Sequence, residues 1–443
     1  MTTIRFQHAI VIGGGIAGLL AARALANSCE GITIIERDTY PDAPTFRAGT
    51  PQARHVHAFP LRGQQILEAF FPSFGESLLK AGARMHDYAS QGLYFYGSRC
   101  PQIAPGLLGW SASRMLVEWQ VRQEMQKFSH VQWVQQCNVR GLLYENHAVR
   151  GVKYQKQGTL ENPIDILEGD LVIDASGSSS EAPIWLEKIG YQPPRETIVN
   201  PFIGYATRVY TCPEEEVYRT WWSGLAIQGT GQNRRAGALM EIEGGRWMVL
   251  LAGSGMDYPP NDPEAYLAFA QSLPEPALYE SIKNATPLSP VYGYRPIGNR
   301  FRHYEQMDMP RGFIIVGDAA CTFNPIYGQG ITVAALEAQA LERCLHTWHR
   351  KKDPFSHFQR HIARLLASPW MLAITADSTQ EDRKTLREQL ANWYLVGHVI
   401  PAIPKDPKVE RIFLEILHML KTPNALLHPA MFVRVLIQSR KKN

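Results

Sequence analysis

The decisive stretch of the sequence is Ala9-Ile10-Val11-Ile12-Gly13-Gly14-Gly15-Ile16-Ala17-Gly18, and a helix-forming run from Leu19 to Ala26 follows it. The short β-branched run predicts a strand, the glycines predict a tight turn, and the last run predicts a helix. In a GxGxxG turn of this kind, Gly13 permits the turn, Gly15 lets a diphosphate approach the backbone, and Gly18 lets helix and strand pack closely. The pattern therefore predicts a dinucleotide whose phosphates lie at the positive end of the helix.

A carboxylate follows at the distance that ribose binding requires. Ile32-Thr33-Ile34-Ile35 predicts the second parallel strand, and Glu36 stands at its carboxyl end, about twenty residues after the turn. A carboxylate in that place accepts hydrogen bonds from a ribose hydroxyl, so it favours FAD or NAD over NADP. Arg37, the next residue, leaves this preference ambiguous.

A second glycine turn lies far downstream. The apolar run from Gly312 to Val316 predicts a strand that leads into Gly317-Asp318-Ala319-Ala320, then into Asn324-Pro325-Ile326-Tyr327-Gly328-Gln329-Gly330, and then into a helix from Ile331 to Cys344. Asp318 is placed to hold a ribityl hydroxyl, and free N–H groups of the turn are placed to face the anion that reduced flavin carries at N1. Together the two turns indicate FAD.

With these two motifs the chain resembles the FAD-dependent monooxygenases of the para-hydroxybenzoate hydroxylase fold, the group A enzymes, and among them the squalene and polyether epoxidases. The resemblance implies an α/β fold with a Rossmann-like FAD-binding domain, interleaved with an antiparallel β-sheet substrate domain (an α+β roof), and a helical C-terminus. We expect the FAD-binding domain in residues 1–75, 114–195 and 301–370, the substrate domain in residues 76–113 and 196–300, and the helical region in residues 371–443.

The resemblance also implies further cofactor contacts. The loop that contains Arg47 resembles the loop that crosses the flavin face, where the arginine lies near the phosphates. The helix that starts at Arg114 resembles the one whose arginine reaches FAD, and Ser111 or Ser113 is expected to cap it. The run from Val134 to Val139 resembles the following strand, whose end contacts adenine.

The expected cofactor contacts are Gly13, Gly15, Ala17, Gly18, Glu36, Arg37, Arg47, Arg114, Val139, Gly317, Asp318, Pro325, Gly328, Gln329 and Gly330. No side-chain base is assigned, because in such enzymes the flavin C4a carries the oxygen as a hydroperoxide. His55 and His57 do not predict a metal site, since no carboxylate or cysteine lies at ligand spacing. They are expected near the flavin edge instead.

The middle motif departs from the pattern of the aromatic hydroxylases. Those enzymes end a strand in Ala-Asp-Gly, with an arginine further on, and both residues are linked with FAD and NADPH handling. Here Ser176 stands in the place of the aspartate and Pro183 in the place of the arginine. We expect NADPH or NADH as the electron donor, acting directly or through a separate reductase.

Aromatic and branched residues predict an antiparallel roof over a ligand cavity. The predicted strands are Gly92 to Tyr96, Phe202 to Tyr210, Ala236 to Ile242 and Arg246 to Ala252. The aromatic residues of this part of the chain are Tyr94, Phe95, Tyr96, Tyr218, Trp221, Trp222, Trp247, Tyr292 and Tyr294. Such a lining predicts a lipophilic substrate, for example a polyene, a terpenoid or a fused aromatic compound.

The predicted reaction is the insertion of one oxygen atom from O₂ into that substrate, by epoxidation of an alkene or by hydroxylation. Two alternatives stay open, an FAD-dependent reductase of isoprenoid double bonds and a non-catalytic escort protein of the same fold. A halogenase is disfavoured, because the sequence lacks a Trp-x-Trp-x-Ile-Pro signature and Trp221-Trp222 has the wrong spacing.

Composition excludes several other classes of protein. The chain has 443 residues and a formal net charge of +4, too small for a nucleic-acid footprint. Its six cysteines are scattered, which predicts neither a zinc site nor a disulfide framework. The apolar run before Gly13 is too short for a secretion signal, so the cytoplasm is expected, and no apolar run is long enough to span a bilayer. For the C-terminal helices, packing on the FAD-binding domain is favoured over peripheral membrane contact.

Overall fold

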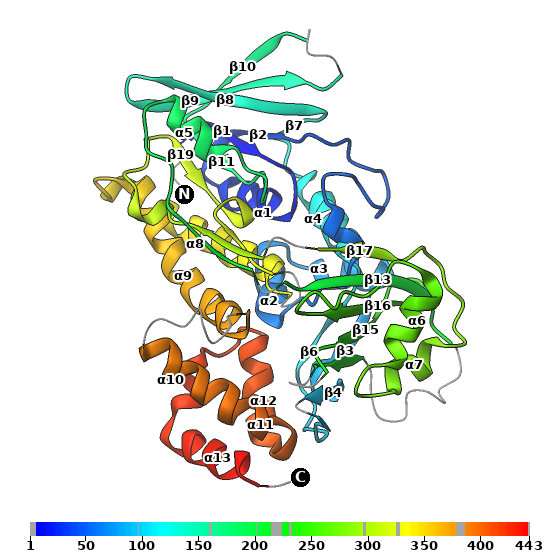
Figure 1. Ribbon diagram of the computed structural model, residues 1–443. Coiled ribbons are helices and arrows are strands. Elements are labelled where there is room, and N and C mark those ends of the chain that lie inside the picture. Colours follow the sequence, from blue (N-terminus) through cyan, green and yellow to red (C-terminus); the bar gives the residue numbers. More distant parts are fainter. Residues whose placement is uncertain are drawn as a thin grey trace.

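The computed structural model describes residues 6–95, 97–158, 162–200, 202–213, 224–229, 233–295, 298–324, 328–377 and 386–441 (Figure 1). At the centre lies a parallel sheet with the strand order β19-β11-β1-β2-β7. Its strands are β1 (Phe6–Ile12), β2 (Cys29–Ile35), β7 (Val131–Val134), β11 (Leu171–Asp174) and β19 (Phe313–Ile315). The inner strands are buried on both faces, as their continuous apolar runs predict.

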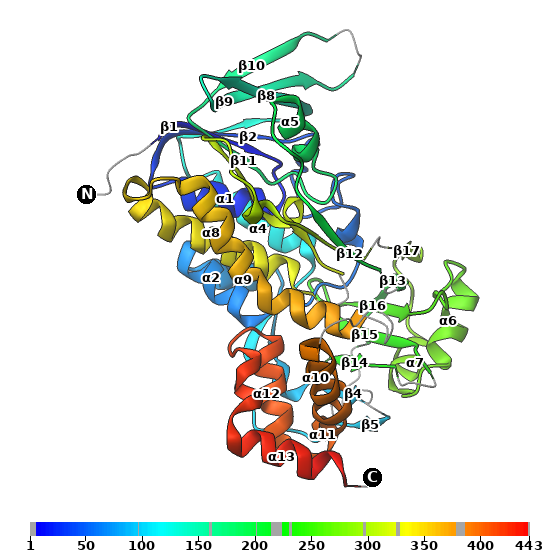
Figure 2. The ribbon, with the colours of Figure 1, turned by 60° about the vertical axis from the view of Figure 1, so that its left-hand side comes forward.

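Helices cover one face of this sheet, and a three-stranded antiparallel sheet covers the other (Figures 1 and 2). The helices are α1 (Ile16–Leu25), α2 (Leu61–Phe70), α3 (Phe74–Lys80), α4 (Arg114–Met125) and α8 (Gly330–Thr347). The antiparallel sheet consists of β8 (Cys137–Glu145), β9 (Ala148–Lys156) and β10 (Ile164–Glu168). Helix α5 (Ala182–Lys188) follows β11.

The single strand predicted from Val134 to Val139 is wrong, because the chain changes sheets within it. Strand β7 ends at Val134 in the parallel sheet, and β8 begins at Cys137 in the antiparallel sheet. Between them Gln136 has a φ of +57°, a left-handed conformation that ends the strand. Nothing in the sequence Val134-Gln135-Gln136-Cys137-Asn138-Val139 marks such a kink.

The second large sheet is antiparallel apart from one parallel pair, and it has the strand order β17-β13-β16-β15-β14-β4-β5. We call it the roof sheet. Its strands are β4 (Gly92–Phe95), β5 (Ser98–Arg99), β13 (Gly204–Thr211), β14 (Leu225–Ile227), β15 (Ala236–Ile242), β16 (Arg246–Gly253) and β17 (Tyr292–Tyr294). Helices α6 (Pro263–Gln271) and α7 (Ala277–Ile282) pack on its outer face, where Trp247, Tyr266 and Leu278 are buried.

Short elements join the two large sheets. The remaining strands are β3 (Arg84–Asp87) with β6 (Leu108–Ser111), and β12 (Glu196–Val199) with β18 (Asn299–Arg302) and β20 (Cys321–Thr322). Single 3₁₀ turns occur at Pro51–Arg54, Tyr88–Ser90, Tyr304–Gln306, Gly317–Ala319, Trp348–Arg350, Ile403–Lys405 and Pro423–Leu427.

The C-terminal part is helical, as predicted. It comprises α9 (Pro354–Asp377), α10 (Leu386–Tyr394), a π-helical turn (Leu395–Val399), α11 (Ile400–Ala402), α12 (Pro407–Leu417) and α13 (Pro429–Ser439). The expected boundary at residue 370 falls inside α9. Leu414 of α12 packs with Leu61 of α2 and Leu93 of β4, so this region contacts both larger parts.

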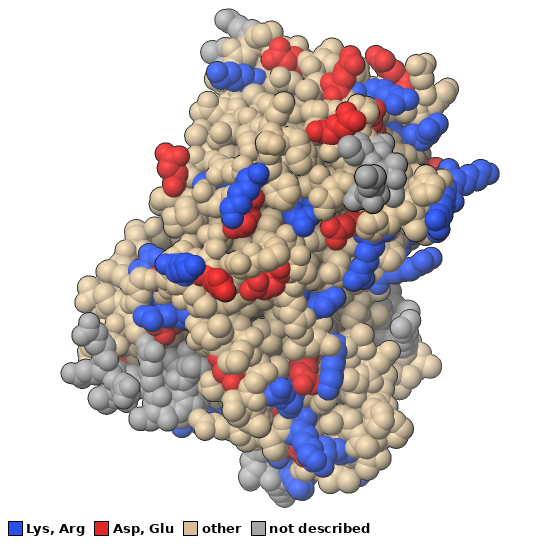
Figure 3. Space-filling model, turned by 180° about the vertical axis from the view of Figure 1, so that it is seen from behind, with Lys and Arg blue, Asp and Glu red and all other residues tan. Residues whose placement is uncertain are grey.

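The prediction of an α/β fold with a parallel sheet, an antiparallel roof and a helical C-terminus is confirmed. On the face seen in Figure 3, basic and acidic side chains are interspersed rather than segregated. Within the described residues, the helices are too short or too polar to cross a bilayer.

Candidate functional site

The first glycine turn is built as the sequence predicts. Gly13 has a φ of +94°, and a Cβ atom on Gly18 would lie 1.8 Å from the Gly13 carbonyl oxygen. Both positions therefore require glycine, one for the backbone conformation and one for close packing. A Cβ atom on Gly15 would meet no atom closer than 3.8 Å, which leaves the turn open to a ligand.

The second turn meets the first in space, although about 300 residues separate them in the sequence. Gly317 has a φ of +64°, and a Cβ atom there would lie 2.8 Å from the Ala17 Cβ. The two turns stand at the carboxyl ends of β1 and β19, at the same edge of the parallel sheet. In open α/β sheets ligands bind at that edge.

A cavity of about 370 Å³ lies between the two turns. Among the predicted cofactor contacts, those that line it are Gly13, Gly15, Ala17, Glu36, Arg37, Arg47, Arg114, Val139, Gly317, Asp318, Gly328 and Gly330. Gly18 and Gln329 do not line it: Gly18 serves the packing of α1, and Gln329 is buried at the start of α8. Pro325 lies outside the described residues.

Sequence reasoning did not assign several residues that line the same cavity. They include Gly49, Thr50, Gln52, Asn138, Arg140, Ser176, Ser179, Glu181 and Trp185. The segment after β11 had a detectable signal, because β11 ends beside β1 and its following loop must reach the same sheet edge. Asn138 and Arg140 lie at the start of β8, and Gly49, Thr50 and Gln52 lie in or next to an irregular loop, where no periodic pattern predicts a ligand contact.

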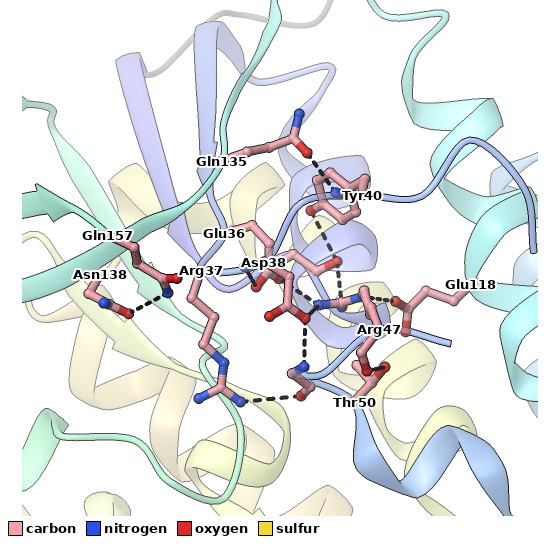
Figure 4. Close-up of polar contacts among 12 residues, drawn as sticks. Glu36, Arg37, Asp38, Tyr40, Arg47, Thr50, Glu118, Gln135, Asn138 and Gln157 are labelled. Atoms are coloured by element: carbon pink, nitrogen blue, oxygen red, sulfur yellow. Dashed lines mark hydrogen bonds and ion pairs between the residues drawn. The ribbon is translucent and has the colours of Figure 1, made fainter. Parts of the chain in front are cut away.

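Glu36 and Arg47 belong to one buried network of charges (Figure 4). Glu36 accepts hydrogen bonds from the backbone N–H groups of Gly14 (2.8 Å) and Asp38 (3.0 Å). Arg47 contacts Glu36 at 3.3 Å, Asp38 at 2.8 Å and Glu118 at 2.8 Å. Burial lowers the pKa of Arg47, but Glu118 and Glu36 outweigh it and raise the pKa above the ordinary value. The guanidinium is therefore always charged.

Helix α4 brings a second arginine to the cavity. Ser113 caps the helix, since its Oγ accepts a hydrogen bond from the Leu116 N–H at 3.2 Å, which confirms one of the two predicted caps. Arg114 is the first helical residue and lies 2.9 Å from Glu118. Arg37 lies on the other side of the network and donates to the Gly49 carbonyl at 3.2 Å.

Among the described residues, the buried Trp185 Nε1 at the cavity has no hydrogen-bond partner, and the buried Arg114 Nη1 has only its ion pair with Glu118. A buried N–H or O–H group without a partner costs about 1–3 kcal/mol. Such groups beside an open cavity are the expected signature of a site whose polar ligand supplies the missing partners.

Burial sets the charges of Asp318 and the two histidines near the cavity. It raises the pKa of Asp318 to about 6, although Arg114 opposes this shift. It lowers the pKa of His57 to about 3, and Arg114 adds to this shift, so His57 is neutral near pH 7. His55 is neutral too, since burial lowers its pKa to about 4, and its Nδ1 lies 2.9 Å from the Thr207 hydroxyl on β13. The histidines thus connect the cavity to the roof sheet.

Comparison with curated proteins finds a relative of nearly the same length. The chain is 29% identical over 428 residues to protein Rv3254 of Mycobacterium tuberculosis, which covers 92% of this chain and 88% of that protein. No protein-family model matches the chain.

Solved structures share the fold at low sequence identity. The flavin-dependent brominase Bmp2 superposes with a TM-score of 0.67 at 15% identity and covers 97% of this chain and 98% of that one. The p-nitrophenol 4-monooxygenase PnpA from Pseudomonas putida superposes with a TM-score of 0.63 at 17% identity, with coverages of 96% and 100%. The myxobacterial chondrochloren halogenase CndH gives 0.61 at 15% identity, with coverages of 96% and 97%. The chain thus has the fold of FAD-dependent monooxygenases and halogenases.

Proposed function

We propose that this protein is an FAD-dependent monooxygenase that inserts one oxygen atom from O₂ into a lipophilic substrate. The observation that carries the proposal is the meeting of two distant glycine turns at one cavity, with Gly317 against Ala17. The first turn alone would suit any dinucleotide, but the second adds the acid and the glycines that a flavin needs. The fold shared with flavin-dependent enzymes supports this assignment.

The residues present fit FAD. Glu36 would hold the adenosine ribose, Arg47 and Arg114 the diphosphate, Val139 the adenine, and Asp318 a ribityl hydroxyl. The unpartnered Trp185 Nε1 would gain a partner from the cofactor or its ordered water. Bound and reduced, FAD supplies the reaction with O₂, and the protein positions the substrate and excludes water.

The inner face of the roof sheet is the proposed substrate site. Tyr294, Tyr205, Ala252 and Ala236 are register partners on successive strands, so their side chains share one face. Tyr205 also packs against His55, with ring centroids 4.7 Å apart. Tyr205, Ala252 and Ala236 pack with Val56 in one apolar cluster, so a substrate at this face would meet apolar side chains, which supports a polyene, terpenoid or fused aromatic substrate.

Tyr205 offers this substrate a polar contact. Its hydroxyl is buried and has no hydrogen-bond partner among the described residues. We propose that an oxygen atom of the substrate supplies that partner.

The predicted aromatic residues divide between the two faces of the roof. Trp247 and Tyr94 pack toward α6 and α7, and Phe95 packs against Phe413 of α12, so these three support the sheet rather than the ligand. Tyr292 and Tyr294 lie on β17 beside β13. Tyr96, Tyr218, Trp221 and Trp222 lie outside the described residues.

The electron donor is proposed to be NADPH or NADH, acting directly or through a reductase. Ser176 and Pro183 lie on the loop after β11 and at the start of α5, where the aromatic hydroxylases carry an acid and an arginine. An uncharged serine and a proline offer the phosphate groups of NADPH no ionic partner. This supports a separate reductase or another docking mode for the nicotinamide cofactor.

The experiment starts from purified protein reconstituted with FAD. We expect a yellow protein with one FAD per chain, and a product that carries one ¹⁸O from labelled O₂ when a linear isoprenoid polyene or a fused phenol is supplied. Turnover under argon without label would instead support a reductase of isoprenoid double bonds. Stable flavin binding without any turnover would favour the escort alternative, and a brominated product in the presence of bromide would favour halogenation.

A further inference from the structure

Glu118 joins two of the arginines that line the cavity, Arg47 and Arg114. Its Oε1 accepts a hydrogen bond from Arg47 Nε at 2.8 Å, and its Oε2 lies 2.9 Å from Arg114 Nη1. The carboxylate is therefore divided between two cations from different parts of the chain; Figure 4 shows its contact with Arg47. Arg47 lies in the irregular loop after β2, whereas Glu118 and Arg114 lie one turn apart on α4.

The two contacts of Glu118 differ in kind. The contact to Arg47 is an aligned hydrogen bond, whereas the contact to Arg114 is an ion pair in which neither Glu118 Oε2 nor Arg114 Nη1 has a hydrogen-bond partner. Arg114 is only 8% exposed and lines the cavity, so its N–H groups remain available to a ligand there. Such a buried unpartnered donor points to an acceptor that arrives from outside.

A helix is a firmer support than a loop for an arginine that must meet a ligand. A free arginine side chain loses up to about 2 kcal/mol of rotamer entropy when it is fixed. By anchoring Arg47 Nε, Glu118 fixes the plane of the guanidinium before any ligand arrives. Asp38 accepts a hydrogen bond from Arg47 Nη1 at 2.8 Å, and Arg47 Nη2 lies 3.5 Å from the Gly14 carbonyl oxygen, so Nη2 is held beside the first glycine turn, where a diphosphate would lie.

We propose that Glu118 is a positioning residue that holds Arg47 and Arg114 for the diphosphate of the bound dinucleotide. The inference rests on the proposed function, because the diphosphate belongs to the FAD of that proposal. A carboxylate does not attract a diphosphate, so Glu118 would favour binding only by holding the two arginines in position.

Asp38 provides the matched control. It contacts Arg47 Nη1 at 2.8 Å, so it also places one negative charge beside that arginine. It also accepts a hydrogen bond from the Gly49 N–H at 2.6 Å, and within the described residues its ion pair is with Arg47 and not with Arg114. If charge alone governed the site, removing either carboxylate would strengthen the binding of an anion. If Glu118 positions the arginines, its removal weakens binding while removal of the Asp38 charge does not.

The test compares Glu118→Gln, Glu118→Ala and Asp38→Asn by titrating cofactor-free protein with FAD and following the flavin fluorescence. We expect Glu118→Gln to weaken FAD binding about 10-fold and Glu118→Ala about 30-fold or more, because the amide can serve only one of the two arginines. Asp38→Asn should bind FAD at least as tightly as the wild type. Riboflavin, which lacks the diphosphate, should bind all the variants and the wild type equally.

Other outcomes overturn the inference. Tighter FAD binding by both Glu118→Gln and Asp38→Asn would mean that charge and not position is what matters, and equal weakening by both would mean that Glu118 has no positioning role beyond that of Asp38. A parallel loss of riboflavin binding or a large fall in Tm would mean that Glu118 only supports the fold. Should Glu118→Ala fail to fold, Glu118→Gln and Glu118→Asp carry the same comparison.

Inorganic pyrophosphate separates this inference from the proposed function. If the wild type is stabilised by pyrophosphate but binds no flavin, the FAD assignment fails, and the Glu118 comparison is then made with pyrophosphate by thermal shift. A wild-type protein that responds to neither probe overturns both.

Discussion

At the residue scale, Glu337 is a buried acid beneath the second glycine turn. It is 1% exposed, its Oε2 accepts a hydrogen bond from the Gly317 N–H at 2.6 Å, and its Oε1 has no partner among the described residues. Burial raises its pKa from 4.5 to about 8, and the Gly317 hydrogen bond only partly opposes this, so the carboxyl is protonated near neutral pH. The proton removes a charge that would repel Asp318 across the turn.

This protonation makes stability depend on pH. The folded protein keeps the Glu337 proton up to a pKa of about 8, whereas the unfolded chain releases it near 4.5. The contribution is therefore fully present below the lower value and is lost as the pH rises toward the upper one. We expect Glu337→Gln to remove this decline. In urea titrations, the free energy of unfolding of the variant should therefore rise relative to that of the wild type as the pH increases between those values. Parallel stability curves for the two proteins would contradict this assignment.

Single residues with a fixed spacing to a motif were predictable, and contacts across the chain were not. Glu36 and Asp318 were found because each stands at a strand end beside a glycine turn. Glu118 lies four residues after Arg114, a spacing that suggests an ion pair on one helix. Its contact with Arg47, which lies 71 residues away in the sequence, depends on tertiary packing that no local pattern encodes.

At the scale of elements, the first turn works because α1 packs directly on it. Helix α1 begins at Ile16, three residues earlier than the predicted helix, so Gly18 sits within the first helical turn. Sequence patterns place such boundaries poorly, since glycines are read as turn residues even where the helix has begun. The existence and order of strand, turn and helix were still predictable, because each has its own composition.

Gly18→Ala should show how tightly this element is packed. The new Cβ would lie 1.8 Å from the Gly13 carbonyl oxygen, a backbone atom that cannot move aside cheaply. We expect the free energy of unfolding to fall by about 1–3 kcal/mol or more in urea titrations. Gly397→Ala is the control, because a Cβ atom there meets nothing within 4 Å. Similar stabilities for the two variants would argue against close packing at the turn.

At the scale of the whole molecule, the C-terminal helices leave apolar side chains uncovered. On α10 and the turn after it, Leu386, Leu390, Trp393 and Val396 are exposed at helical spacing. Residues 386–441 contain eight Lys and Arg against four Asp and Glu. An apolar face on a basic region is the pattern of a peripheral contact with an anionic lipid surface.

We expect the protein to sediment with vesicles that contain phosphatidylserine and less with vesicles of phosphatidylcholine alone. The double substitution Leu390→Ser and Trp393→Ser should reduce the bound fraction about 5-fold or more, because both side chains would lose their burial in the interface. The control is Ile166→Ser, which replaces an exposed apolar side chain on β10, far from the C-terminal helices in the sequence. Leu93→Ser would not serve, because Leu93 is buried. Equal sedimentation of all three proteins would exclude this contact.

Strand β19 lies at the edge of the parallel sheet, and this position determines when the sheet can be completed during translation. On the ribosome, the partner strand β11 leaves the exit tunnel with residue 174, but β19 follows only with residue 315, after the strands of the roof sheet have been translated. The nascent chain must carry an unpaired strand edge throughout that interval, a state prone to aggregation. Cofactor loading is consequently a late event, and truncated translation products should be clients of chaperones and not flavoproteins.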